Sequence, residues 1–360
     1  MFGTMTGPLE KTISAKIRQV FGQQTSLSAL TPLAGDASNR RYYRAFLESP
    51  SIPRSVVVME LTGSSLPLSS EELSVFKEAP KELPFLSVHR FLKELGIRVP
   101  DLYGHWVDEG ILLLEDLGDC CLWDVVQALP SAEVVSWYKK AIDELLRLQI
   151  LGSRFPDLSC IAFQQRFDFR LYMWEFEHFI QYGLEKETGQ TSEAEKKLLM
   201  ESFTRISRRL DATPPCLNHR DYHSWNLMVH QGGIVVIDFQ DALIAPMQYD
   251  LTSLLNDRET DRIIQPDLEG QLVGYYLQRR EEMGESAVDR DEFNELYLLS
   301  ALQRDLKVVG RFYYLEMVKG KPGYKKYIPG TLRRVKRNLL RLPGMESTLA
   351  ILAAHFEDLR

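Results

Sequence analysis

The sequence contains no long hydrophobic segment. Nowhere in its 360 residues do apolar side chains continue without interruption for the ~18 positions that a membrane-spanning helix requires. The first eight residues also lack the basic start and the apolar core of a secretory signal peptide. From these two absences we expect a cytoplasmic protein that has no membrane partner.

Cysteine is scarce, and its spacing suits neither a metal site nor a redox pair. Cys120, Cys121, Cys160 and Cys216 form no Cys-x-x-Cys pair and have no histidine at metal-binding spacing. We therefore expect reduced thiols, as is usual inside cells. The chain also shows no internal repeat and no low-complexity tract.

An excess of one charge occurs only locally. The chain carries 43 basic and 50 acidic residues, yet residues 304–341 contain 12 Lys or Arg and only two acids, Asp305 and Glu316. A nucleic-acid-binding tail would have a similar excess. Because apolar residues recur here at helical spacing, we instead expect packed helices and no nucleic-acid partner. The basic residues then form either a solvated helix face or an electropositive wall for an anionic substrate or nucleotide.

The residues that carry chemistry lie near the middle of the chain. Residues 219–226 read His-Arg-Asp-Tyr-His-Ser-Trp-Asn, and an apolar run then ends at Asp238. HRD followed after four residues by Asn is the catalytic-loop signature of kinases. In phosphoryl transfer an Asp meets the acceptor hydroxyl, while an Asn and a second Asp hold Mg²⁺ against the ATP phosphates. The alternatives are a turn around a buried histidine and a kinase fold without catalysis.

The order of the expected elements is typical of a kinase. Before Gly118 we expect a helix, three strands, a helix and two strands, at 10–22, within 30–46 (two strands), at 55–61, at 84–95, from Pro100 and at 111–114. Amphipathic helices at 131–151 and 163–182 follow, and helix is nearly continuous after Asp238. We therefore predict an α+β, bilobal, protein-kinase-like fold, with a small β-rich lobe at 1–115 containing one main helix and a larger, mostly helical lobe at 116–360.

The motifs resemble those of the aminoglycoside phosphotransferase and choline kinase superfamily of small-molecule kinases. This resemblance rests on HRDYHSWNL at 219–227, IDFQDA at 237–242 and YDL at 249–251. The GxGxxG loop and the APE motif of protein kinases are both missing. The chain looks most like the anomeric N-acetylmuramate/N-acetylglucosamine kinases of cell-wall recycling, through GDASNRRYYR at 35–44, PFLSVHRFLKELGIRVPDL at 84–102, ALQRDLKVVGRF at 301–312 and KPGYKKYIP at 321–329.

The resemblance implies ATP and Mg²⁺ as cofactors and a small sugar as the acceptor, and we expect a monomer. Asp221 would be the catalytic base that accepts the hydroxyl proton. Asn226 and Asp238 would supply the oxygen ligands that Mg²⁺ prefers. Asp241 would touch substrate or metal, or cap a turn. Two residues are expected to be structural supports of the catalytic loop, namely His219 and Asp250.

The turn at 35–39 is expected to cover the ATP phosphates. It has a single glycine, so Ser38 and Asn39 would add side-chain donors to those of the backbone. At the boundary between the lobes, Glu115 and Leu117 would offer a backbone carbonyl and N–H to the edge of the adenine.

The strand at 55–61 lacks the Lys that usually binds the α- and β-phosphates, and the following helix lacks its Glu partner. We expect Arg41, or Arg40, to replace the Lys, because a guanidinium fork suits phosphate. The alternative is a pair of surface arginines. If a strand resumes at Arg40, alternation places Arg40, Tyr42 and Arg44 on one face, with Tyr42 over the adenine.

Three basic residues, Arg304, Lys307 and Arg311, share one helical face and are candidates for the acceptor pocket. A solvated basic stripe is the alternative. Such a face suits the lactyl carboxylate of a muramate and argues against a polycationic aminoglycoside. We predict ATP- and Mg²⁺-dependent phosphorylation of the anomeric hydroxyl of an N-acetyl amino sugar. The open alternatives are another small alcohol, such as an aminoglycoside or a choline-like amino alcohol, and a non-catalytic nucleotide-binding regulatory module.

Overall fold

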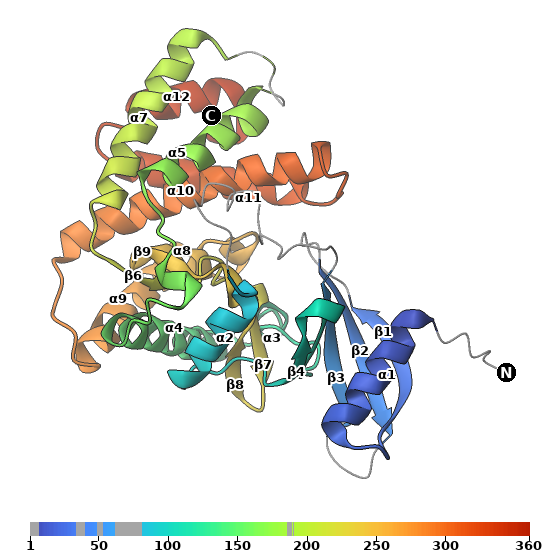
Figure 1. The fold of residues 1–360 in the computed structure, drawn as a ribbon. Helices are drawn as coiled ribbons and strands as arrows, with labels where there is room; N and C mark the ends of the chain where they lie inside the picture. The colour runs from blue at the N-terminus through green and yellow to red at the C-terminus, as the bar shows by residue number, and fades with distance from the viewer. Residues whose placement is uncertain (1–6, 34–39, 49–52, 62–80, 186–188, 190) are drawn as a thin grey trace.

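A five-stranded antiparallel sheet forms one end of the molecule (Figure 1). The computed structural model describes residues 7–33, 40–48, 53–61, 81–185, 189 and 191–360. The strand order is β1-β2-β3-β5-β4. The bounds are Ser26–Leu33 for β1, Arg40–Glu48 for β2, Ser55–Leu61 for β3, Leu102–Trp106 for β4 and Ile111–Glu115 for β5.

Helix α1, Pro8–Phe21, covers one face of this sheet. Ile13 and Ile17 are fully buried against Val56 and Val58, which alternate along β3. The opposite face of β2 and β3 is turned toward the rest of the chain and lines a cavity, described below. The predicted alternation in β2 is confirmed, because Arg40, Tyr42 and Arg44 all line that cavity.

Helix α2, Pro84–Glu94, lies between the sheet and the helical part of the molecule. Phe85, Val88 and Leu92 bury one face of the helix at the predicted 3.6-residue period. The helix stops before Gly96, whose φ of +70° is a left-handed conformation that favours glycine. The predicted order of strands and helix up to Glu115 is therefore confirmed.

The remainder of the chain is mostly helical and contains two pairs of short antiparallel strands (Figure 1). Strand β6 pairs with β9, and β7 pairs with β8. Their bounds are Pro215–Asn218, Leu227–His230, Gly233–Val236 and Leu243–Pro246 for β6 to β9. The helices are α3 Leu122–Val126, α4 Ser131–Arg154, α5 Phe169–His178, α7 Glu193–Asp211, α8 Gln248–Leu255, α9 Pro266–Glu282, α10 Arg290–Met317, α11 Ile328–Arg341 and α12 Glu346–His355. In the described part of the chain, no helix has the length and apolar character needed to cross a membrane.

The helix predicted at 163–182 differs from the structure at its start. Residues 165–167 run beside β9, where Phe167 N donates to Ile244 O and Ile244 N donates to Gln165 O. Helix α5 begins only after Asp168, whose carboxylate accepts from Leu171 N at 3.0 Å. Pairing with a strand therefore overrides helix formation in the first turn of this segment.

The connection between the two parts of the molecule runs from the end of β5 at Glu115 to the start of α3 at Leu122. Our proposed division into lobes at 1–115 and 116–360 falls in this connection. One side of the cavity belongs to the sheet and the other to the helical part.

Candidate active site

The catalytic-loop sequence, residues 219–226, follows β6, and the buried side chain of Asp250 supports its backbone. Asp250 of α8 is fully buried, and both of its carboxylate oxygens accept backbone N–H groups, from His219 and from Arg220 (3.0 Å). Arg220 has a φ of +80°, a strained conformation for a residue with a side chain. Two hydrogen bonds to one buried carboxyl group therefore fix the loop where its backbone turns.

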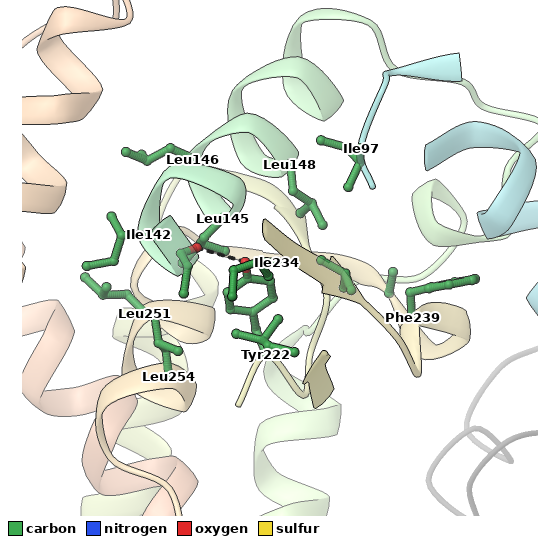
Figure 2. Packing of buried hydrophobic residues seen from close by; sticks show 14 of the residues in the cluster. Ile97, Ile142, Leu145, Leu146, Leu148, Tyr222, Ile234, Phe239, Leu251 and Leu254 are labelled. Carbon is green, nitrogen blue, oxygen red and sulfur yellow. Dashed lines mark hydrogen bonds between the residues drawn. The ribbon is translucent and has the colours of Figure 1, made fainter. Parts of the chain in front are cut away.

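Two further residues anchor the loop on either side of Asp221. His219 donates from Nε2 to Ile237 O at 2.8 Å, and burial lowers the pKa of its imidazole, so the ring is neutral. Tyr222 is fully buried in the hydrophobic core, and its hydroxyl donates to Ala141 O of α4 at 2.8 Å (Figure 2). The loop is thus fixed on both sides of Asp221, by the hydrogen bonds of His219 and of Tyr222, and these contacts determine the position of Asp221.

Asp221, Asn226 and Asp238 line one cavity of about 740 Å³. The Asn226 amide nitrogen donates to Asp221 O at 3.0 Å, so its Oδ1 remains as an acceptor. Asp238 has a φ of +61°, and Gln240 Nε2 donates to its carboxylate at 2.7 Å. One carboxylate and one amide oxygen on the same cavity are a donor set that fits Mg²⁺ bound together with phosphate oxygens.

The residue after Asp238 connects this site to α2. The Phe239 ring is buried and lies 4.9 Å from the ring of Phe85 and 6.0 Å from that of His89. His89, on the buried side of α2, donates from Nε2 to Pro100 O at 2.8 Å, and burial lowers the pKa of its imidazole. Aromatic packing thus takes the place of the missing Lys–Glu pair in holding α2 against the site.

Positive charges surround the Asp221 carboxylate. Burial favours its neutral form, but Lys307 and Arg304 outweigh burial and hold the pKa of Asp221 well below its usual range. A guanidinium nitrogen of Arg304 lies 3.4 Å from Asp221 Oδ1, and another contact at 3.1 Å reaches Arg220 O. Asp221 is therefore ionised and oriented, and its side chain is still 38% exposed to the cavity.

The three predicted basic residues of α10 all line this cavity. The Arg304 side chain is only 3% exposed, so it does not belong to a solvated stripe. Lys307 pairs with the fully buried carboxylate of Glu175 at 3.1 Å. Arg311 lies a turn further along and contacts the ring of Tyr314.

On the sheet side of the cavity, the side chains of the two arginines at the start of β2 point in different directions. The Arg40 side chain is 5% exposed and lies 4.0 Å from Asp238, while that of Arg41 is 68% exposed and pairs with Glu60. Arg40 and Tyr42 line the cavity. The predicted phosphate donors Ser38 and Asn39 lie outside the described residues.

The connection after β5 also reaches the cavity, through Glu115 and Leu117 among others. The Glu115 carboxylate pairs with Arg98 at 2.5 Å, and Leu117 O accepts from His230 Nδ1 at 3.2 Å. These contacts hold the backbone that we expect to meet an adenine.

Sequence reasoning missed the pair that ties this connection to the sheet. Arg44 of β2 makes a bidentate contact to Asp116, at 2.7 and 3.0 Å, and Ser55 of β3 donates to the same carboxylate at 2.7 Å. Burial would raise the pKa of Asp116, but these hydrogen bonds lower it, so the carboxylate is ionised. No local pattern pointed to a pair whose members are 72 residues apart.

Other residues at the acceptor end were also missed. Asp257 pairs with Arg304 at 3.7 Å, and the Arg258 guanidinium lies 4.9 Å from the centre of the Trp225 ring. These residues follow α8 and carry no motif. Asp241 lines the cavity near Asp238, and burial raises its pKa to about 7. Asp241 is thus protonated in part at neutral pH, unlike Asp221.

The arrangement of these residues defines a class of protein. An ionised Asp on a rigid loop, an Asn and a second Asp at one cavity, and a sheet on its other side are the parts of a phosphoryl-transfer site. The comparisons agree with this class. Residues 29–286 match the Phosphotransferase enzyme family, and the chain belongs to this family. It is a phosphotransferase with an alcohol group as its acceptor.

Curated relatives match nearly the whole chain. An N-acetylmuramate/N-acetylglucosamine kinase of Pseudomonas putida is 28% identical over 94% of this chain and 91% of its own length. The protein of the same name from Neisseria meningitidis is 29% identical over 91% of this chain and 92% of its own. Among solved structures, choline kinase LicA from Streptococcus pneumoniae has a TM-score of 0.59 at 15% identity, over 93% of this chain and 98% of that one. That likeness shows the protein-kinase-like, bilobal α+β fold and confirms the fold prediction.

Proposed function

We propose that this chain is an ATP- and Mg²⁺-dependent kinase that phosphorylates the anomeric hydroxyl of N-acetylmuramate and N-acetylglucosamine, in cell-wall sugar recycling. The observation that carries the proposal is the convergence of Asp221, Asn226 and Asp238 on one cavity. The names of the relatives, which match over nine-tenths of the chain, support the substrate class.

The electrostatics of Asp221 support an anomeric acceptor. A carboxylate whose pKa is held below its usual range is a weak base. It accepts a proton most readily from an acidic hydroxyl, late in a loose transition state. The hemiacetal hydroxyl at C1 of a sugar is more acidic than the other hydroxyls, so it matches this base best.

Each remaining residue has a defined task in the proposed reaction. Asn226 Oδ1 and the Asp238 carboxylate would hold Mg²⁺, which neutralises the charge of the phosphates when bound. Arg40, buried beside Asp238, would donate to the phosphates in place of the missing Lys. Tyr42 would cover the adenine, and the backbone at Glu115 and Leu117 would meet its edge.

The acceptor end of the cavity disfavours cationic acceptors. The lining there contains the cations Arg258, Arg304, Lys307 and Arg311, together with the acids Asp221, Asp241 and Asp257. A polycationic aminoglycoside or a quaternary amine would meet the positive charge of Arg311, which no described acid pairs with, and this costs binding energy. An uncharged or anionic sugar would not.

The test is ATP consumption with Mg²⁺ and a panel of N-acetylmuramate, N-acetylglucosamine, glucose, choline and kanamycin. Three proteins are compared: the wild type, Asp221→Asn, and Asp108→Asn as a control that makes the same change at an exposed site. We expect turnover with the two N-acetyl sugars in the wild type and the control, and a loss of about 10²-fold or more in Asp221→Asn.

The product distinguishes the position of transfer. Phosphorylation at C1 removes the reducing end of the sugar and gives an acid-labile phosphate, whereas transfer to another hydroxyl leaves the reducing end intact. Turnover with only choline or kanamycin would overturn the sugar assignment. A rise in melting temperature on addition of ATP would show that the protein binds the nucleotide. If no acceptor then led to ATP consumption, the result would support a regulatory module instead.

A further inference from the structure

The basic residues that α10 presents to the cavity differ in what balances their charge. Arg304 pairs with Asp221 and with Asp257, at 3.4 and 3.7 Å. Lys307 pairs with the buried carboxylate of Glu175 at 3.1 Å. Both cations are therefore compensated inside the protein and add little attraction for an anionic ligand.

Among the described residues, no acid compensates the charge of Arg311 in this way. Arg311 lines the same cavity, one helical turn beyond Lys307. Within the described ranges, no Asp or Glu lies at ion-pair distance from its guanidinium group; the group lies 5.2 Å from the centre of the Tyr314 ring. An aromatic face holds a cation in place but carries no net negative charge. A positioned positive charge thus faces the cavity.

The surroundings of Arg311 are apolar. Val308, Phe312 and Leu315, from the same helix, line the cavity beside it. A cation next to an apolar wall is complementary to a carboxylate carried on a short aliphatic group. Along the helix axis, Arg311 lies about 10 Å from Arg304, at 1.5 Å per residue. A sugar whose C1 hydroxyl meets Asp221 would therefore extend its far substituent toward Arg311.

We propose that Arg311 binds the lactyl carboxylate of N-acetylmuramate and sets the preference of the enzyme for this anionic sugar over neutral N-acetylglucosamine. The lactyl methyl group packs on the apolar wall formed by Val308, Phe312 and Leu315. This assignment rests on the proposed function and names the residue that discriminates between its two substrates.

The experiment measures kcat and KM for both sugars in the wild type and three variants. Arg311→Gln removes the charge, Arg311→Lys keeps it without the planar fork, and Arg290→Gln makes the same change at an exposed site of the same helix. In Arg311→Gln we expect kcat/KM for N-acetylmuramate to fall about tenfold or more, through KM, and that for N-acetylglucosamine to change less than about twofold. Arg311→Lys should recover part of the loss, and Arg290→Gln should equal the wild type.

The outcomes separate this assignment from the proposed function. If the wild type consumes ATP with neither sugar, the proposed function fails and the role of Arg311 fails with it. If the wild type uses both sugars and Arg311→Gln lowers kcat/KM for both by the same factor, or for neither, only the role of Arg311 is overturned. Use of N-acetylglucosamine alone by the wild type would also overturn it.

Discussion

Arg304 and Asp221 face one another between α10 and the catalytic loop, with a guanidinium nitrogen 3.4 Å from Asp221 Oδ1. Arg304 also donates to Arg220 O and pairs with Asp257. One buried cation thus contacts the proposed catalytic carboxylate, the backbone next to it and the carboxylate of Asp257. We regard Arg304 as a positioning residue rather than a substrate contact, since its side chain is almost fully buried.

Replacing Arg304 should move the pH profile of the enzyme. In the proposed reaction Asp221 must be ionised to accept a proton; burial would raise its pKa, but the positive charges of Lys307 and Arg304 hold the pKa low. In Arg304→Gln the pKa of Asp221 rises, so the acidic limb of the kcat/KM profile shifts to higher pH, and kcat at neutral pH falls by about tenfold or more. Arg304→Lys keeps the charge and should leave the limb close to that of the wild type. An unchanged limb in a folded Arg304→Gln would contradict this view.

The two arginines at the start of β2 form a matched pair of variants. Arg40 is buried beside Asp238, whereas Arg41 is exposed beside Glu60. We expect Arg40→Gln to lower kcat/KM for ATP by about tenfold or more, because a charge-assisted contact to phosphate is lost. Arg41→Gln should change it by less than about twofold. Equal effects of the two substitutions would show that neither arginine replaces the missing Lys.

Asp250 supports the catalytic loop through both of its oxygens, and Asp250→Asn should reveal this. Asn offers one acceptor oxygen, so either His219 N–H or Arg220 N–H would face an amide NH₂ group. We expect a loss of about 1–3 kcal/mol in the free energy of unfolding, measured by urea denaturation, and a lower kcat. Asp108→Asn, at an exposed position, serves as the control and should leave both quantities unchanged.

The anchor of the loop in the core can be tested at Tyr222. Tyr222→Phe removes only the hydrogen bond to Ala141 O and should cost about 1 kcal/mol of the free energy of unfolding. Tyr222→Ala also empties a fully buried volume and should cost about 3–5 kcal/mol. If Tyr222→Phe lowered kcat without changing stability, the hydroxyl would have a role that this packing does not explain.

Features encoded in contiguous residues were accessible from the sequence. The catalytic loop and the apolar run that ends at Asp238 lie within 20 residues of each other, so their spacing alone pointed to phosphoryl transfer. The alternation that brings Arg40, Tyr42 and Arg44 to one face follows from strand geometry. The amphipathic helices followed from the period of their apolar residues.

Features that depend on packing between distant segments were not accessible. The Arg44–Asp116 pair and the Lys307–Glu175 pair join elements far apart in the chain, so no local sequence pattern indicates which acid each cation pairs with. The start of α5 was placed too early because the chain before Asp168 pairs with β9. The sequence also could not decide whether the basic residues of α10 form a solvated stripe or a cavity wall, because the answer depends on where the catalytic loop lies relative to α10.

Trp225 occupies an unusual place among these residues. It precedes Asn226 in the loop, lines the cavity, and stacks on Trp123 with ring centres 4.7 Å apart. The guanidinium of Arg258 lies 4.9 Å from the centre of the Trp225 ring. Indole emission depends on the polarity and charge around the ring, so we expect a ligand bound beside Trp225 to change the fluorescence of that residue. The chain therefore carries a spectroscopic probe of its own site, which requires no label.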